Sequence, residues 1–204
     1  KINGIGIDTS KFRKDDTLKN YLNKEFKLPD DSVKLLSVGE LIPRKNHEVI
    51  IQALAKLDNP KVFYFIAGDG ELKSELNNLI KTLNLEKNVF LLGYRTDISQ
   101  LCNSSDIFVM PSIHEGLSVA LMEAMGCGKP VIASRIRGNV DLIEQGKGGY
   151  LCNTNEIDMY ARAVEKLALS AGKCKQFGEY NQSVVKLFDI GLVKKQLMRI
   201  LEEN

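Results

Sequence analysis

Val33-Lys-Leu-Leu-Ser-Val38 and Val62-Phe-Tyr-Phe-Ile-Ala67 are two short and almost continuously apolar runs. The segment between them, His47–Leu57, carries its apolar residues at helical spacing. Runs of this length and composition are typical of strands that are buried on both faces, as in parallel sheets. A strand, a helix and a second strand in this order predict a right-handed βαβ unit.

The same alternation continues down the chain. Four further strands are predicted at Val89–Leu92, Ile107–Met110, Val131–Ala133 and Gly149–Leu151. Helices are predicted at Leu72–Leu83, Ile98–Asn103, Ser118–Gly126 and Val140–Glu144. After Glu156 the strand pattern stops, and helical segments are expected at 156–171, 173–188 and 190–203. The predicted fold class is therefore α/β, a doubly wound parallel sheet with C-terminal helices.

This pattern predicts three parts of the chain. Residues 1–32 form a linker with a short helix, residues 33–155 form the α/β core, and residues 156–204 form helices that pack on the same domain. An alternative is that these last helices reach across to another domain. The chain opens with Lys1 at a turn-rich segment, as expected for a piece of a longer protein, and shows no signal-peptide pattern.

The composition argues against several classes of protein. Of 204 residues, 44% are apolar and 26% charged, which is ordinary for a soluble globular domain. The net charge of +2 is too small to indicate a nucleic-acid partner. No apolar run approaches the roughly 20 residues of a membrane span. The four cysteines lie more than 20 residues apart, which excludes the usual zinc and redox spacings and is typical of reduced cytosolic thiols.

The loops that follow the strands are the first candidates for a binding site, because ligands of open parallel sheets bind outside the carboxyl ends of the strands. The most informative one lies in Pro111-Ser-Ile-His-Glu-Gly-Leu-Ser-Val-Ala-Leu-Met-Glu-Ala-Met-Gly-Cys-Gly-Lys-Pro130. Gly116 lets the backbone come close to a ligand, and Ser118 is a natural helix N-cap. The free N–H groups of Leu117 to Ala120 then favour an anion.

Glu123 is the only charge in the apolar helix that follows. A carboxylate in such surroundings needs hydrogen-bond donors. Either the ribose diol of a ligand or the backbone of a neighbouring loop can supply them. Glu115, just before the helix, is placed to accept hydrogen bonds from sugar hydroxyls.

Glu115 and Glu123 are set in E-G-L-S-x-x-L-x-E-A-M-x-C-G-K-P-V-I-A-S, with seven residues between them. This pattern resembles the signature of retaining family 4 (group 1) glycosyltransferases. The resemblance covers nearly the whole chain and begins at Asn3–Phe12, which is similar to the linker where the donor-binding domain of a two-domain GT-B-type enzyme starts. It implies that Glu115 faces and orients the donor sugar, and that Glu123 holds the ribose.

A second loop, Gly39-Glu-Leu-Ile-Pro-Arg-Lys-Asn-His47, places two cations after the first strand. Each charge-assisted bond to a phosphate contributes roughly 1.5–3 kcal/mol. Members of the resembled family usually have an arginine directly after the glycine and a lysine five residues later, both on the donor pyrophosphate. Lys45 matches the lysine, but Glu40 stands where the arginine is expected. Arg44 either replaces that arginine or is a solvated loop cation.

Other loops supply weaker candidates for donor binding. Gly68 either makes a tight turn or approaches the donor. The backbone at Tyr94 and Arg95 is placed to reach a nucleobase edge, with the Tyr94 ring packing nearby or serving only in the core or at its rim. The backbone around Gly138 borders either the sugar or the acceptor, although exposed loop arginines such as its neighbours are usually only solvated.

The two histidines favour local roles. His114 either approaches the sugar or packs locally, and His47 is expected to bond a loop carbonyl. Neither has partners at ligand spacing, so no metal site is predicted. A Ser/His/Asp hydrolase finds no support because no G-x-S-x-G elbow exists. A dinucleotide-dependent oxidoreductase is disfavoured because the first strand is not followed by G-x-G-x-x-G, and an epimerase would need more acid and base groups.

The expected function is donor binding in a glycosyltransferase that moves a sugar from a nucleoside diphosphate, UDP favoured, to an acceptor hydroxyl with retention. Bacterial polysaccharide or glycolipid assembly is the expected context, and a catalytically inert nucleotide-sugar-binding module is the alternative. Glu115 and Lys45 are the expected catalytic residues. No cofactor or metal is expected, because Lys45 and the Ser118 helix N-terminus offset the charge on the leaving diphosphate.

The resemblance also implies partners and a location. The donor is a nucleotide sugar, and the acceptor is a saccharide or a lipid-linked saccharide. The acceptor is expected to bind to an N-terminal domain that this chain does not contain, so the chain alone is expected to bind nucleotide without transferring sugar. The expected location is the cytoplasm, either free or held at the inner membrane through that domain.

Overall fold

The computed structural model describes residues 5–202. Its centre is a parallel sheet whose strands are β1 (Val33–Val38), β2 (Val62–Ala67), β3 (Val89–Gly93), β4 (Ile107–Met110), β5 (Val131–Ser134) and β6 (Gly149–Cys152). The strand order is β3-β2-β1-β4-β5-β6, and every pairing is parallel. Each strand lies within one residue of its predicted bounds at either end. The predicted doubly wound α/β fold is confirmed.

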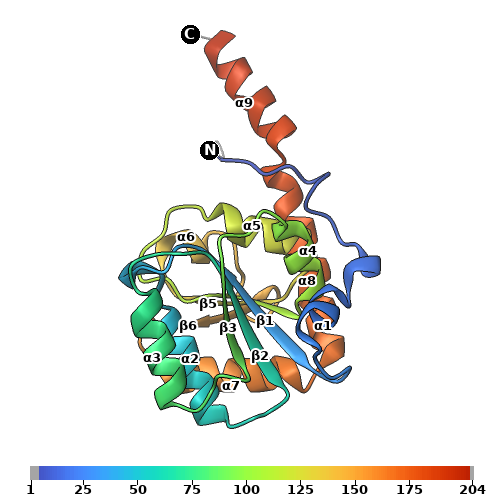
Figure 1. Ribbon diagram of the computed structural model, residues 1–204. Coiled ribbons are helices and arrows are strands. Elements are labelled where there is room, and N and C mark those ends of the chain that lie inside the picture. The colour runs from blue at the N-terminus through green and yellow to red at the C-terminus, as the bar shows by residue number, and fades with distance from the viewer. Residues whose placement is uncertain (1–4, 203–204) are drawn as a thin grey trace.

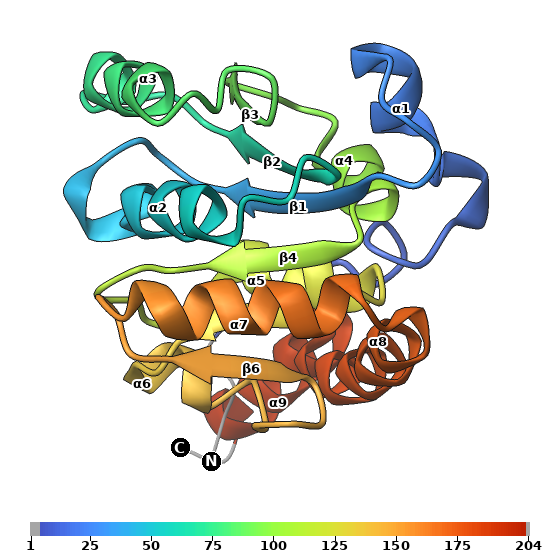
Figure 2. The ribbon, with the colours of Figure 1, turned by 90° about the horizontal axis from the view of Figure 1, so that it is seen from below.

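Helices cover both faces of the sheet (Figures 1 and 2). On one face lie α2 (His47–Leu57), α3 (Lys73–Thr82) and α7 (Ile157–Ala168). On the other lie α1 (Tyr21–Phe26), α4 (Ile98–Ser104), α5 (Val119–Gly126) and α8 (Ala171–Val185). Because successive strand residues point to opposite faces, Leu35 and Tyr64 belong to the first core, and Leu36 and Phe65 to the second.

The helix predicted at Val140–Glu144 is wrong. The structure instead has the short helix α6 at Arg137–Val140, and the chain is irregular after it. Leu142 and Ile143 are buried without being helical, and their N–H groups bond the carbonyl of Asn139. Their apolar character comes from packing in the core, so helical spacing was the wrong interpretation of this segment.

The remaining elements are short 3-10 turns and the last helix, which begins beside the N-terminal segment. Short 3-10 turns occur at η1 (Asp16–Leu18), η2 (Pro43–Lys45) and η3 (Lys186–Phe188). The last helix, α9 (Ile190–Glu202), begins beside Ile7, whose carbonyl accepts from the N–H of Ile190. It then extends away from the body of the molecule (Figure 1).

Most of α9 does not pack on the domain. Val193 is buried, but every side chain from Lys194 to Arg199 is exposed. The expectation that all of residues 156–204 pack on one domain is therefore too broad. Positions 1–4 of the predicted linker and positions 203–204 of the last predicted segment lie outside the described residues. Within residues 5–202, no helix combines the length and the apolar character that crossing a bilayer requires.

The order of the strands determines where a ligand can bind. The chain runs outward from β1 through β2 to β3, and then returns to the other side of β1 at β4. The chain therefore leaves β1 toward α2 on one face of the sheet and leaves β4 toward α5 on the other face. In open α/β sheets this switch point opens the crevice in which ligands bind.

Candidate functional site

The loop after β1 is fixed by a left-handed asparagine. Asn46 ends η2 with φ 52° and ψ 38°, a conformation that asparagine tolerates better than most residues. Its side-chain amide donates to the carbonyl of Pro111 at 3.3 Å and to that of Thr154 at 2.9 Å. The N–H of Ile113 in turn donates to the carbonyl of Arg44 at 2.8 Å. These bonds hold the loops after β1 and β4 against each other.

His47 supports the same loop from within the core. Its imidazole lies 3.3 Å from the carbonyl oxygen of Glu40 and 3.2 Å from the hydroxyl of Tyr64. Burial lowers the pKa of His47 to about 4, so the ring is neutral at physiological pH. The predicted bond from His47 to a loop carbonyl is confirmed.

The loop after β4 ends in the predicted helix cap. The hydroxyl of Ser118 accepts from the N–H of Leu121 at 3.3 Å, and α5 begins at Val119. Within residues 5–202, the N–H groups of Val119 and Ala120 have no protein partner. The N-terminal end of α5 therefore presents open donors at the switch point, a favourable place for an anion.

The loop after β5 presses against the same region. A Cβ on Gly138 would lie 1.8 Å from the carbonyl oxygen of Gly116, so this position requires glycine. Ser134 donates to the carbonyl of Ser112, and Asn139 donates to that of Ser134 at 2.9 Å. The loop that carries Glu115 is thus supported from both neighbouring loops.

Glu115, Lys45 and Arg44 meet at one point. The Lys45 ammonium lies 2.6 Å from Oε1 of Glu115, and the Arg44 guanidinium lies 3.1 Å from the same oxygen. The Arg44 guanidinium also donates to the carbonyl of His114 at 3.0 Å. One carboxylate therefore balances two cations, and the cluster keeps one excess positive charge.

These three side chains differ in exposure. Lys45 and Glu115 are 14% and 11% exposed, whereas Arg44 is 43% exposed. Burial by itself raises the pKa of Glu115, but hydrogen bonds from Lys45 and Ser112 and the nearby charges outweigh it and leave the pKa below its ordinary value. The carboxylate is ionised at neutral pH, and Lys45 is held in place for an incoming anion.

Glu123 lies on α5 and is partly buried. Within residues 5–202, no side chain or backbone group hydrogen-bonds its carboxyl, so the alternative in which it caps a neighbouring loop finds no support. Burial raises its pKa to about 7, with Lys11 lowering it slightly. A carboxyl in this state gains stability from any ligand that donates hydrogen bonds to it.

Two of the predicted glycines are explained by close packing. A Cβ on Gly68 would lie 1.9 Å from the carbonyl oxygen of Gly39, so these strand ends pack backbone against backbone. A Cβ on Gly39 would meet the Lys45 side chain at 3.1 Å. Gly39 therefore leaves room for the lysine, and Gly68 is required by close backbone packing, a role that the sequence analysis did not predict.

Arg95 and Tyr94 have different surroundings. The Arg95 guanidinium donates to Asp97 at 2.6 and 2.7 Å and to Glu25 at 2.6 and 3.1 Å. These carboxylates occupy four of its five N–H donors, so its side chain links α1 to the loop after β3. The Tyr94 ring is 83% exposed, which excludes core packing.

The remaining candidates border the cluster. His114 and Gly116 are exposed, and Leu117 packs partly against the core beneath α5. Glu40, which replaces an expected arginine, is also exposed.

Across residues 5–202, no group of three or more His, Cys, Asp or Glu side chains is arranged to hold a metal ion. Cys102, Cys127, Cys152 and Cys174 are free thiols.

Sequence reasoning missed several residues that build the site. Asn46, Ser112, Ser134 and Asn139 hold the loops in place through backbone carbonyls. For Asn46 a signal was present, because an asparagine directly before a helix often ends a turn in the left-handed conformation. The other three cannot be recognised without knowing which loops are neighbours.

Strand order and site together define a class of protein. An open parallel sheet with two cations and a helix N-terminus with open N–H groups at its switch point is a Rossmann-like domain suited to an anionic ligand. The model of the family "Glycosyl transferases group 1" matches residues 19–184. The chain belongs to this glycosyltransferase family, and its fold is that of one half of a GT-B-type enzyme.

Similar proteins include enzymes and solved structures. The chain is 35% identical over 167 residues to the UDP-Gal:alpha-D-GlcNAc-diphosphoundecaprenol alpha-1,3-galactosyltransferase of Escherichia coli, covering 79% of this chain and 43% of that enzyme. Anabaena Alr3699/HepE, solved with UDP-glucose, superposes with a TM-score of 0.91 at 26% identity, over 98% of this chain and 56% of that one.

A third similar structure is matched by this chain over its whole length. The C-terminal domain of the group 1 glycosyl transferase LpcC from Francisella tularensis has a TM-score of 0.80 at 20% identity. The match covers 91% of this chain and 100% of that one. The chain thus corresponds to the C-terminal domain of these enzymes, and it spans about half the length of the curated relatives it matches.

Proposed function

We propose that this chain binds a nucleoside-diphosphate sugar at the carboxyl edge of its sheet and supplies the donor half of a retaining glycosyltransferase. The observation that carries the proposal is the meeting of Lys45 and Arg44 on a single oxygen of Glu115. The excess positive charge lies beside the N-terminus of α5, whose first N–H groups are open. Both features favour a diphosphate.

UDP is the proposed nucleotide. Two relatives support this choice, because one is named for its UDP-Gal donor and another was solved with UDP-glucose. The acceptor is proposed to be a hydroxyl of a saccharide or of a lipid-linked saccharide, as in bacterial polysaccharide or glycolipid assembly. Its binding site would belong to a second domain, and the reaction would take place on the cytoplasmic side of the membrane.

Each residue of the cluster then has a separate task. Lys45 and Arg44 bond the diphosphate instead of Glu115, and N–H groups at the α5 N-terminus donate to it as well. The released Glu115 carboxylate accepts from hydroxyls of the sugar and orients it. Glu123 accepts from the ribose diol, which supplies the hydrogen-bond donors that its carboxyl lacks in the free protein.

The charge on the leaving diphosphate is proposed to be offset by protein groups. Lys45 and Arg44 meet at Glu115, just before the N-terminus of α5, and the proposed pose puts the diphosphate beside these groups. Such preorganised donors stabilise a leaving group without reorganisation at the moment of reaction. Metal-independent donor binding follows, and UDP affinity measured with EDTA should equal that measured with Mg²⁺.

Calorimetry with UDP, GDP and ADP on the 204-residue chain tests the proposal. We expect UDP to bind most tightly, with GDP and ADP weaker by about tenfold, a difference of about 1.4 kcal/mol. Binding of none of the three nucleotides would overturn the proposed donor site. Equal binding of all three would leave the site but remove the preference for uracil.

Transfer is tested separately. The chain alone is proposed to bind UDP-glucose without passing glucose to an added acceptor, because it spans about half the length of the relatives that it matches. Sugar transfer by the isolated chain would contradict this. Nucleotide binding without any transfer by the complete gene product would instead favour an inert nucleotide-sugar-binding module.

A further inference from the structure

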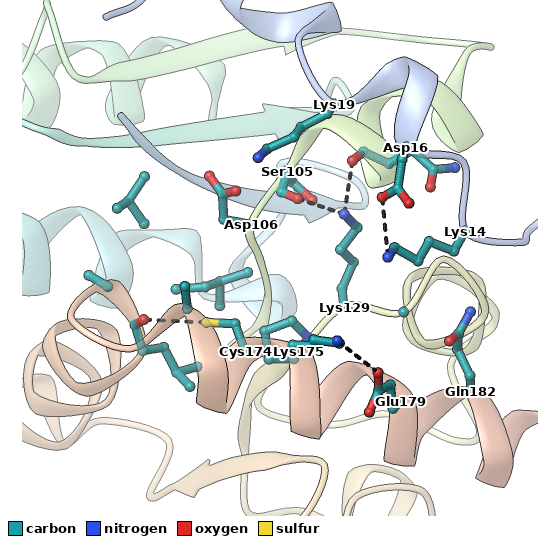
Figure 3. A pocket seen from close by; sticks show the side chains of 18 of the residues that line it. Lys14, Asp16, Lys19, Ser105, Asp106, Lys129, Cys174, Lys175, Glu179 and Gln182 are labelled. Atoms are coloured by element: carbon teal, nitrogen blue, oxygen red, sulfur yellow. Dashed lines mark hydrogen bonds and ion pairs between the residues drawn. The ribbon is translucent and has the colours of Figure 1, made fainter. Parts of the chain in front are cut away.

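A cavity lies at the amino-terminal edge of the sheet, away from the cluster of Lys45 and Glu115. Its volume is about 440 Å³, within the range of small-molecule sites. It is bordered by the segments that lead into β1, β4 and β5, by the η1 turn, and by α7 and α8 (Figure 3). The proposed function assigns no role to this cavity.

Lys129 is the central polar group of the cavity. Its ammonium donates to the backbone carbonyls of Asn103 and Ser105, both at 2.8 Å. No carboxylate in the described chain lies within ion-pair distance of it. An ammonium has three donors, so one N–H remains for a ligand. Figure 3 shows the ammonium between Ser105 and the turn that carries Lys14 and Asp16.

Partial burial has an energetic consequence for Lys129. Desolvation lowers the pKa of its ammonium, despite the more distant negative charge of Asp106. A partly buried cation without a carboxylate partner is stabilised by an anion beside it. The cavity therefore has a place where negative charge is favoured.

The acids around the cavity are already engaged. Asp106 is paired with Lys34 at 3.2 Å, and Asp16 with Lys14 at 3.2 Å. On α8, Glu179 faces Lys175 at 3.9 Å. The carboxylate of Asp15 caps η1 by accepting from Thr17. Of the lining lysines in the described chain, Lys19 and Lys129 have no carboxylate partner.

The opposite wall is largely apolar. It is formed by the end of α7 and the start of α8, with the side chains of Leu167, Ala168, Ala171 and Cys174. Figure 3 shows Cys174 and Lys175 on α8 across from the turn that carries Lys19. The cavity thus combines a cationic end with an apolar wall.

We propose that this cavity binds a small organic anion whose oxyanion group, phosphate or carboxylate, bonds the ammonium of Lys129. Lys19 flanks the anion from the η1 turn, and the apolar part of the ligand lies against Leu167 and Ala171. The proposal does not depend on the donor site, because no residue is shared between the two.

Amide chemical shifts measured during titration with phenyl phosphate and phenylacetate test this proposal. We expect either anion to shift the resonances of Gly128, Lys129 and Gly172, and the stronger of the two identifies phosphate or carboxylate as the favoured group. Benzyl alcohol, which has the ring but no charge, should bind at least about tenfold more weakly. Shifts confined to Gly39 and Gly116 would indicate the donor site alone and would overturn the proposal.

Substitutions make the test specific to the cavity. Lys129→Met should weaken the favoured anion at least about tenfold, while Lys81→Met, an exposed lysine on α3, should leave its affinity unchanged. Since Lys129 also bonds two carbonyls, Ala171→Phe provides an independent check by filling the apolar end and leaving the lysine intact. Unchanged affinity in both cavity variants, or equal binding of benzyl alcohol, would refute the site.

Discussion

Two clusters of charged side chains lie at the carboxyl end of the sheet, one around Arg95 and one around Glu115. In the first, one guanidinium donates four bonds to two carboxylates, Glu25 and Asp97. Tyr21 adds a further bond to Asp97 at 2.8 Å. Hydrogen bonds from Arg95, and then from Tyr21, lower the pKa of Asp97 to about 2 despite partial burial.

The cluster around Glu115 has the opposite balance of charge. One carboxylate oxygen faces both Lys45 and Arg44, and the open N–H groups of α5 lie nearby. Glu123 on the same helix has no hydrogen-bond donor in the described chain, and burial raises its pKa to about 7. The acidic cluster around Arg95 links elements of the fold, whereas the cationic cluster around Glu115 favours an anionic ligand. The four predictions below test this distinction.

The largest effect is expected from Lys45. Lys45→Ala removes a charge-assisted bond to the diphosphate and should weaken UDP binding about 10- to 100-fold. Calorimetry measures this change. Arg95→Ala is the matched control from the other cluster and should keep UDP affinity within about twofold. A larger loss in the Arg95 variant would show that both clusters bind the nucleotide.

The raised pKa of Glu123 should make the stability of the protein depend on pH. In the unfolded chain the carboxyl loses its proton near its ordinary pKa of 4.5, and in the folded chain near 7. Between these values the folded state binds more protons, so its stability falls as pH rises and then levels off above about 7. Because the side chain is partly exposed, solvent screening reduces the effect, and relative to Glu123→Gln the wild type should lose about 1–2 kcal/mol between pH 5 and pH 8.

Urea unfolding of both proteins at the two pH values provides the measurement. The Gln variant cannot ionise at this position, so it corrects for every other titrating group. A parallel pH dependence of the two proteins would mean that Glu123 is better solvated than its surroundings indicate.

Arg95 should affect stability rather than binding. Arg95→Met leaves Asp97 and Glu25 without their cation and should lower the free energy of unfolding by about 1–2 kcal/mol, between the values for exposed and buried pairs. The loss should diminish as pH falls toward the lowered pKa of Asp97. Lys81→Met, on the exposed face of α3, is the control and should unfold like the wild type.

The smallest effect is expected from Glu115. Glu115→Gln frees Lys45 and Arg44 and removes a negative charge beside the diphosphate, so UDP itself should bind about threefold more tightly. UDP-glucose should gain less, because its sugar loses an acceptor. If UDP instead binds more weakly, the carboxylate must position Lys45 rather than compete with the diphosphate.

The strands and most of the helices could be predicted because their signals are local. An apolar run of six residues such as Val62–Ala67 carries its own strand pattern, and Ser118 marks its own helix cap. The helix at Val140–Glu144 failed because Leu142 and Ile143 are apolar for a tertiary reason. No local pattern separates a core-filling loop from one turn of helix.

Residue partners could not be predicted in the same way. Arg44 was expected either to reach the donor or to be a solvated cation, and the backbone at Arg95 was expected to reach a nucleobase edge. The Arg95 side chain bonds Glu25, a residue 70 positions away in the chain. In the sequence, Lys129 was only one residue of the quoted motif, but in the structure it lines a cavity together with residues of η1, α4 and α8.

The sequence by itself determined the α/β alternation, the strand-end loops that carry the site, and the family to which Glu115 and Glu123 point. These follow from periodicity and from the order of residue types along the chain. Only the tertiary structure decided which charged side chains bond one another and which cluster has an excess of positive charge. That outcome depends on distances between segments far apart in the sequence, because electrostatic and hydrogen-bond energies depend on separation in space.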